Sequence, residues 1–344
     1  MAQATISGVI DQAYYTSKFT SAAGTSLTSK GVGAQNNGTS EFTISSKEDL
    51  GGGMHASFAL NVQADLGSGG TATNTAAQGT GTNNGMAMRR SFIGLDGGFG
   101  SVKLGNQWTP IFFTVLAADP TALVSSTGAG LVGAGYAVGA NANSITYALP
   151  TFVSGLGISL QKGQGDETAG ATASTAGANT GGNVTYATGA LMVSYSMQKA
   201  TAGAASTLTT SAGLGPVNGT SLATLVAGTS KVSSSATAVT YDLGMAKVSY
   251  LMTSDKVSGT TAKVSGNAYG LSVPVTGATT LALIMSSTSN TTATGATSKE
   301  KGSRYAVFHA LSKRTTAYAF MGKSSLNGAT TAHSMTAFGL QHGF

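Results

Sequence analysis

Apolar and polar residues alternate at every second position over much of this chain. In the segment 56–65 the alternation gives an apolar face and a polar face: Phe58, Leu60 and Val62 against Ser57, Asn61, Gln63 and Asp65. The same alternation recurs in the segments 144–149, 191–198 and 247–253. A period of two predicts β-strands that lie between an apolar and a polar medium. No segment has the pattern of an amphipathic helix with comparable clarity.

The connectors between these strands come in two sizes that take turns along the chain. The short ones are EDLGGG (48–53), GGFG (97–100), VSGLG (153–157), ATG (187–189), LGM (243–245), TGA (276–278) and KRT (313–315). In GGFG we expect the glycines to supply the positive-φ positions of a tight turn. The long connectors are rich in Gly, Ser, Thr and Asn and include 17–40, 67–85, 164–182 and 200–234. Seven tight and eight long connectors, one of them 108–143, predict an up-and-down antiparallel meander of 16 strands.

The low charge content indicates that this meander lies in a membrane. Only 9% of the residues are charged, whereas soluble domains have about 25%. No run approaches the roughly 18 to 20 apolar residues of a spanning helix. Sixteen strands leave about 21 residues for each strand and its connector, which suits membrane strands of about 9 to 11 residues. The sequence therefore predicts one domain, residues 1–344, with an all-β fold: a 16-stranded antiparallel up-and-down transmembrane β-barrel.

The charge, the cysteine content and the N-terminal residues indicate which partners the protein has and which cellular compartment it passes through. The net charge is +6, but the 18 Lys and Arg are scattered and seldom alternate with aromatic residues, so we expect no nucleic-acid partner. The chain has no Cys and hence no disulfide or thiolate metal site, which is compatible with an oxidising periplasmic route. The N-terminal MAQATISG lacks the basic and apolar regions of a signal peptide, so we expect a mature chain with an added Met1.

The chain carries no convincing catalytic or cofactor motif. Gly128, Gly130 and Gly133 match the G-x-G-x-x-G pattern, but no acid occurs between Asp119 and Asp166 and no good helix follows. None of the four His residues has metal-ligand spacing or belongs to an evident Ser-His-acid set: His55, His309, His333 and His342. We therefore expect a protein that is not an enzyme and that binds no cofactor and no metal.

Five segments spread in order over the chain resemble the trimeric general porins of Gram-negative β-proteobacteria, including the neisserial kind. They are SKEDLGGGMHASFALN (46–61), RRSFIGLDGGFGSVKLGNQWTP (89–110), NSITYALP (143–150), SRYAVFHALSKRTTAYAFMGK (303–323) and AFGLQHGF (337–344). The resemblance implies a homotrimer in the outer membrane, surrounded by lipid and lipopolysaccharide. It also implies a long loop 3, from about Trp108 to Asn143, folded into the lumen as a constriction. Phe344 would be the C-terminal aromatic residue that the barrel-assembly machinery recognises.

The function implied by this resemblance is a water-filled channel for passive diffusion of small hydrophilic solutes and ions. The net charge of +6 favours a mild anion preference. Glu41 and Asn106 stand where the family often has basic residues, which argues against strong selectivity. Two alternatives remain open. A substrate-specific outer-membrane channel would need an ordered ladder of basic or aromatic lumen residues, and a β-rich surface adhesin or layer protein would need internal repeats.

Strand parity and the resemblance together nominate pore-lining residues. Arg89 and Arg90 are adjacent on a strand, so strict alternation places them on opposite faces. The resemblance favours Arg89 as the lumen residue, although the sequence leaves open which of the two faces inward. The residues expected at the pore lining or constriction are Arg89, Lys103, Glu41, Lys47 and Asp119. Parity also directs a further set of charged residues into the barrel: Asp11, Asp65, Asp242 and Lys247.

Loop 3 is unusually apolar for a loop in a water-filled pore. Residues 108–143 carry a single charge, that of Asp119. So apolar a segment is costly when it is left free in water. We therefore expect the loop to lie against the barrel wall and to narrow the pore by volume more than by charge. The side chains expected to be buried there are Phe112, Phe113, Val115 and Leu116.

Overall fold

The computed structural model describes residues 4–21, 23–34, 40–64, 86–121, 140–165, 177–203, 206–209, 221–226, 228–326, 330 and 332–344. These ranges contain strands and one short helix, α1 (Pro110–Ala118). The strands are β1 (Thr5–Thr20), β2 (Ser26–Ala34), β3 (Glu41–Gly51), β4 (Met54–Ala64), β5 (Met86–Gly97), β6 (Gly100–Trp108), β7 (Ala140–Ala148), β8 (Leu156–Gly163), β9 (Asn179–Thr188), β10 (Leu191–Thr201), β11 (Ser206–Thr209), β12 (Ser221–Leu225), β13 (Lys231–Asp242), β14 (Lys247–Val257), β15 (Lys263–Pro274), β16 (Thr279–Thr291), β17 (Thr297–Ala310), β18 (Thr315–Leu326) and β19 (Ala332–Gly343). No helix within the described ranges is long and apolar enough to cross a membrane.

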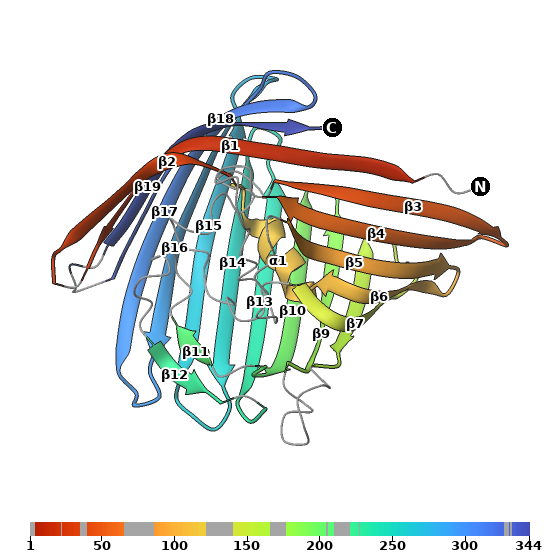
Figure 1. The fold of residues 1–344 in the computed structure, drawn as a ribbon, viewed down its shortest axis with the longest axis horizontal. Coiled ribbons are helices and arrows are strands. Elements are labelled where there is room, and N and C mark those ends of the chain that lie inside the picture. The colour runs from red at the N-terminus through yellow and green to blue at the C-terminus, as the bar shows by residue number, and fades with distance from the viewer. Residues whose placement is uncertain are drawn as a thin grey trace.

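The sheet closes on itself where β1 meets β19, as Figure 1 shows. Residues 9–20 of β1 pair antiparallel with β19 along this seam. On its other edge β1 pairs with β2 through residues 12–20 and with β3 through residues 5–9. Because β2 and β3 occupy successive parts of one edge, they share one place in the ring, so the 17-stranded sheet is a barrel of 16 positions. The predicted 16-stranded antiparallel barrel is confirmed.

The connectors follow the predicted alternation at one end of the barrel and depart from it at the other. Each of the seven short connectors joins two neighbouring strands of the barrel by a turn. At the opposite end, however, the loops 258–262 and 292–296 are also short. The segment 17–40, predicted to be a connector, instead contains the end of β1 and all of β2. Of the glycines in GGFG, Gly100 has a positive φ, 102°, whereas the others do not.

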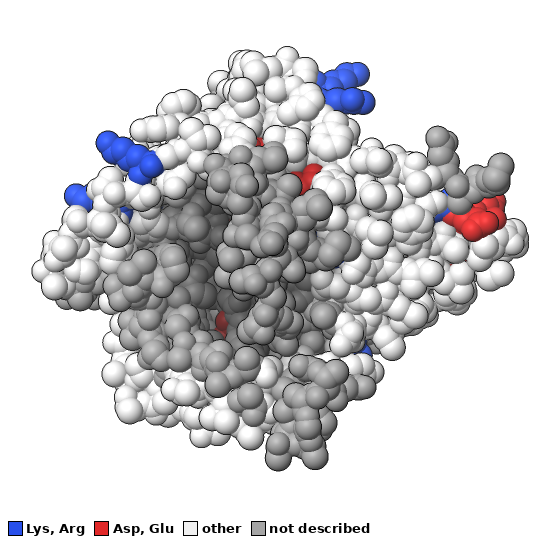
Figure 2. Space-filling model, viewed as in Figure 1, with Lys and Arg blue, Asp and Glu red and all other residues white. Residues whose placement is uncertain are grey.

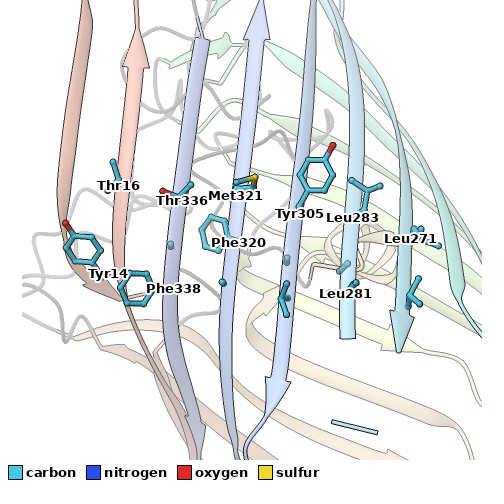
Figure 3. A pocket seen from close by; sticks show the side chains of 16 residues that line it. Tyr14, Thr16, Leu271, Leu281, Leu283, Tyr305, Phe320, Met321, Thr336 and Phe338 are labelled. Carbon is cyan, nitrogen blue, oxygen red and sulfur yellow. The ribbon is translucent and has the colours of Figure 1, made fainter. Parts of the chain in front are cut away.

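Side chains alternate between the inside and the outside of the barrel along each strand. On β14, Thr253 and Asp255 are buried inside, whereas Met252 is half exposed on the outer face. The outer face is predominantly apolar, which is what a strand wall needs where it meets hydrocarbon. A shallow groove of about 670 Å³ crosses the outside of β15–β19 and β1 (Figure 3), with ridges formed by Tyr14, Leu283, Tyr305, Met321 and Phe338.

α1 lies inside the barrel and packs against β10, β13 and β14 (Figure 1). Pro110 begins the helix at a position where its missing N–H removes no helical hydrogen bond. Ile111 and Val115 are 0% and 1% exposed, and they pack in one apolar cluster with wall residues that include Ala236, Leu251 and Ile284. Loop 3 therefore folds into the lumen over residues 109–121, and its remainder, including Gly128, Gly130 and Gly133, lies outside the described residues.

The helix buries a different set of side chains from the predicted one. The expectation of burial is correct for Val115 but wrong for Phe113, which is 50% exposed. Phe112 and Leu116 are intermediate between these two. The helical period explains the difference, because Ile111, Thr114, Val115 and Ala118 share the face that touches the wall. Phe113 lies on the opposite face and points away from that wall.

Polar contacts hold the middle and the C-terminal end of α1 to the wall as well. Thr114 Oγ1 lies 2.8 Å from Ser194 Oγ of β10, and Ser249 Oγ of β14 donates to the carbonyl oxygen of Ala118 at 2.6 Å. Just after the helix, the Asp119 carboxylate accepts hydrogen bonds from Thr121 and lies 3.6 Å from the Arg304 guanidinium of β17. These contacts fix where loop 3 crosses the lumen.

The ion pair between Asp119 and Arg304 is almost completely enclosed, with side-chain exposures of 1% and 2%. Arg304→Met leaves the Asp119 carboxylate buried without its cation, a loss that in buried pairs costs about 3–5 kcal/mol. We expect larger fluctuations of the single-channel current and a lower temperature of the heat-induced mobility shift on gels. Combining Arg304→Met with Asp119→Asn should restore both, because the uncompensated charge is then gone. Unchanged current and temperature in Arg304→Met would show that this pair does not anchor loop 3.

Candidate pore constriction

A β-bulge in β5 brings two arginines to the same side of the wall. Asn61 of β4 lies opposite Arg90, and the next residue of β4, Val62, lies opposite Met88, so Arg89 is the extra residue. Such a bulge disturbs the strict alternation of faces and re-aims side chains. Both guanidinium groups contact Glu41 of β3: Arg89 donates directly to the carboxylate, and Arg90 lies 3.9 Å from it.

The expectation that Arg89 and Arg90 point to opposite faces is therefore wrong. It assumed a regular strand, and the register shift between Asn61 and Val62 removes that regularity. Asn61 is buried inside the barrel and donates to Thr43 Oγ1, on the same face of β3 as Glu41. Both arginines consequently belong to the inner wall, where they contact Glu41 of β3 across β4.

A second irregularity, an extra residue in β7 opposite β6, lies close to the first. The register against β7 shifts between Gly105 and Gln107, and Gly105 has a φ of 135°, which favours glycine. Asn106, the β6 residue at this register shift, donates its side-chain amide to the backbone oxygen of Arg89 at 3.0 Å. Asn106 stands where the resembling family often has a basic residue, and here its side chain supports the backbone of Arg89.

Aromatic side chains extend from the arginines to α1. The guanidinium carbon of Arg89 lies 4.7 Å from the centre of the Trp108 ring. Trp108 stacks on Phe112 with ring centres 4.3 Å apart, and Phe112 meets Phe113 edge-on at 5.7 Å. The sequence-based prediction missed this row because it placed Trp108 at the start of loop 3 and expected Phe112 to be buried against the wall. The i to i+4 spacing of Trp108 and Phe112 is the signal that could have revealed it.

The other nominated pore residues are only partly brought to this place. Lys103 of β6 faces inward with its ammonium nitrogen 4.9 Å from the ring of Phe92 on β5. Lys47 also faces inward, opposite Ser57, but it lies six residues along β3 from Glu41, about 20 Å away near the tight turns. Asp119 is enclosed by its partners rather than open to the pore.

The C-terminal residue, Phe344, extends the β1 seam. Its backbone N–H donates to the oxygen of Gly8 at 3.0 Å and its oxygen accepts from the N–H of Gly8 at 3.0 Å. The phenyl ring is about half exposed, on the same outer face as Phe338 and Leu340. The even numbering of these three residues predicts that they share one face, and the structure confirms it.

The positive net charge of the chain resides mainly on the outside of the barrel. Ten lysines alternate with inward residues and lie exposed near the long-loop ends of their strands: Lys18, Lys30, Lys162, Lys199, Lys231, Lys256, Lys263, Lys299, Lys301 and Lys323. Figure 2 shows most of its blue side chains at the margin of the molecule. The charges inside the barrel nearly balance among the described residues. The basic ones are Lys47, Arg89, Arg90, Lys103, Lys247 and Arg304, and the acidic ones are Asp11, Glu41, Asp96, Asp242, Asp255 and Glu300 on the strands and Asp119 in loop 3. The argument from net charge to anion preference therefore does not hold.

Solved structures of similar fold are bacterial porins and outer-membrane proteins. An anion-selective porin from Comamonas acidovorans is 22% identical, covers 100% of both chains and has a TM-score of 0.76. The trimer form of OmpT from Vibrio cholerae is 13% identical, covers 100% of this chain and 99% of the other, and has a TM-score of 0.68. OmpF of Salmonella typhi, in complex with daunomycin, is 12% identical, covers 99% and 97%, and has a TM-score of 0.69. At these identities the likeness shows the fold.

Family membership rests on the sequence. No curated protein sequence matches the chain. The family profile described as Gram-negative porin, however, matches residues 1–329. That span contains every strand of the barrel except β19, and it overturns the alternative of a surface adhesin or layer protein. Because the match covers nearly the whole chain, the protein belongs to the Gram-negative porins and forms a β-barrel channel in the outer membrane.

Proposed function

We propose that the protein is a passive, non-catalytic pore for small hydrophilic solutes and ions, with a mild preference for anions. The observation that carries this proposal is local: two arginines share one carboxylate, that of Glu41, and Lys103 lies on the next strand. The Asp119 carboxylate of loop 3 offsets Arg304 instead. The anion selectivity stated for the Comamonas porin supports the same sign.

The strength of the preference follows from how far each charge is neutralised. Glu41 is in direct contact with Arg89, so that pair has little net field at a distance. Arg90 lies further from the carboxylate and is about one third exposed. Arg90 and Lys103 therefore leave a modest local excess of positive charge, which raises the local concentration of anions. The effect falls with salt, because the Debye length is about 10 Å at 0.1 M.

Charge removal at the constriction should change ion selectivity in opposite directions. Neutralising both Arg90 and Lys103 with Gln should move the reversal potential in a tenfold KCl gradient toward cations, whereas Glu41→Gln should move it toward anions. Lys301→Gln, on the outer face, is the control and should leave the potential unchanged. Cation selectivity of the unmodified channel in planar bilayers would contradict the proposed preference.

We also propose that the protein is a homotrimer with its subunit interface over the outer face of β3–β7. None of the outer lysines among the described residues lies on these strands. Their outer side chains are instead exposed and apolar: Phe58, Leu60, Ile93, Leu104 and Ile145. A surface that is both apolar and free of lysine suits a protein partner, and the trimer form of the Vibrio OmpT supports the assembly.

The proposed trimer interface can be tested by introducing a single arginine there and, in a control variant, on the opposite outer face of the barrel. Ile93→Arg places a cation in the proposed interface and should convert trimers into monomers, as measured by light scattering in detergent. Met285→Arg is the matched control, because Met285 is similarly exposed on the outer face of β16 and should leave the trimer intact. Trimers that persist in Ile93→Arg would place the interface elsewhere.

The rest of the outer face fits the lipid of the outer membrane, including lipopolysaccharide. Lys301 and Lys323 line a cleft of about 420 Å³ together with Ser287, Ser303 and Ser325. A second cleft, of about 400 Å³, contains Lys162, Lys199 and Lys231. Directly below the first cleft, on the same strands, lies the apolar groove of Figure 3. Lysines above an apolar band are complementary to lipopolysaccharide, whose phosphate groups lie above its acyl chains.

We propose that Phe344 is the residue that the barrel-assembly machinery recognises.

The lysine cleft gives a direct test of lipid binding. Replacing Lys301 and Lys323 with Gln removes about 2 kcal/mol of attraction to an anionic lipid surface, at roughly 1 kcal/mol for each lysine. We expect the purified trimer to retain several-fold less lipopolysaccharide, measured as phosphate per protein. Lys103→Gln, inside the barrel, should retain the normal amount. Equal retention in the double variant would show that these lysines do not hold the lipid.

A further inference from the structure

The lumen contains an aromatic surface that the passage of ions does not require. α1 turns Ile111 and Val115 to the wall and leaves Phe113 half exposed on its opposite face. That face lies inside the barrel, because the helix itself is packed on the inner wall (Figure 1). An exposed phenyl ring in a water-filled passage costs free energy unless something apolar covers it from time to time.

This surface is continuous with the arginines of the constriction. Phe113 contacts Phe112, Phe112 stacks on Trp108, and Trp108 lies under the guanidinium of Arg89, each step being shorter than 6 Å between the centres given above. Arg90 stands beside Arg89 and has a buried Nε without a hydrogen-bond partner among the described residues. The wall of the constriction is therefore cationic at one end and aromatic at the other.

We propose that this row is a binding subsite for small aromatic carboxylates of the benzoate class, an inference that rests on the proposed pore function. The carboxylate accepts hydrogen bonds from Arg89 and Arg90, which exchange part of their contact with Glu41 for the solute. The ring lies against Phe113 and Phe112 in an offset or edge-on arrangement, the geometry that aromatic pairs favour. The subsite makes the channel select by chemical class within the anions it admits.

The row presents guanidinium groups at one end and phenyl rings at the other, and this order favours aromatic carboxylates over other solutes. Acetate can contact the arginines but has nothing to place on Phe113. A neutral sugar can cover the phenyl ring but leaves the guanidinium groups without an anion. Binding must also be weak, because a channel site has to release what it takes up. A shallow open row with a half-exposed ring satisfies that condition, whereas a closed pocket would not.

The test uses full-length trimers in planar bilayers, with KCl as the conducting salt and benzoate as the probe. We expect benzoate to reduce the KCl conductance in a saturable way. Phe113→Ala should raise the half-blocking concentration about three- to tenfold, the range that one aromatic contact supplies. Phe113→Leu should give a smaller increase, and it serves as the second variant if the alanine form does not assemble. Acetate should change the conductance equally in all three proteins.

Matched controls separate this subsite from general effects. Phe152→Ala removes an equally large exposed ring from a turn outside the barrel lumen and should leave the benzoate block unchanged. Cyclohexanecarboxylate should block at least twofold less than benzoate, and equal block would overturn the aromatic preference. A benzoate effect that is linear, or independent of Phe113, would overturn the subsite while the channel and its anion preference stand. An unmodified protein that forms no channel would instead overturn the proposed function.

Discussion

Pairing of β1 with β19 is the contact on which the rest of the molecule depends. In hydrocarbon an unpaired backbone N–H or C=O has no water to bind, so a sheet that spans a membrane must have no free edge. The seam pairs residues 9–20 of β1 with β19, and Phe344 continues it with reciprocal hydrogen bonds to Gly8. Once the ring is closed, every strand has a defined inner and outer face. The lumen, the lipid surface and the site of loop 3 all follow from this division.

Inside the ring, local irregularities place the functional groups. A regular strand can offer only every second side chain to the lumen. The bulge at Arg89 breaks this limit and puts two adjacent arginines on the inner wall, while the side chain of Asn106 supports the backbone of Arg89. α1 then carries the aromatic row from β6 toward the opposite wall. The candidate constriction thus consists of departures from the barrel's own periodicity, braced by the regular strands around them.

The distribution of charge separates the two environments that the barrel wall meets. Lysines are concentrated outside at one end of the strands, where the flexible stem of each lysine can lie on apolar surface while its ammonium group reaches polar headgroups. Inside, basic and acidic groups nearly cancel, and the arginines occupy fixed contacts with Glu41 and Asp119. A single net charge for the chain averages over these two surfaces. The charge that an ion meets in the pore is therefore a local quantity.

The sequence alone determined the class of fold, the 16 strand positions of the barrel, the tight turns and the parity of most strands. These properties depend on alternation and on turn residues, which are local in the chain, and the residues 56–65 display both faces without any tertiary information. Even Lys103 and Lys47 could be assigned to the inner face in this way. The terminal parity of Phe338 and Phe344 belongs to the same group of local features.

Only the tertiary structure decided which side chains meet. The register shift opposite Asn61 is a relation between two strands, so no pattern within β5 could show that Arg89 and Arg90 share a face. Likewise, the partner of Asp119 is Arg304, 185 residues away along the chain, and the exposure of Phe113 depends on which face of α1 the walls of β10 and β13 accept. Periodicity describes one strand at a time, whereas a constriction is made by contacts between elements that the closed ring brings together.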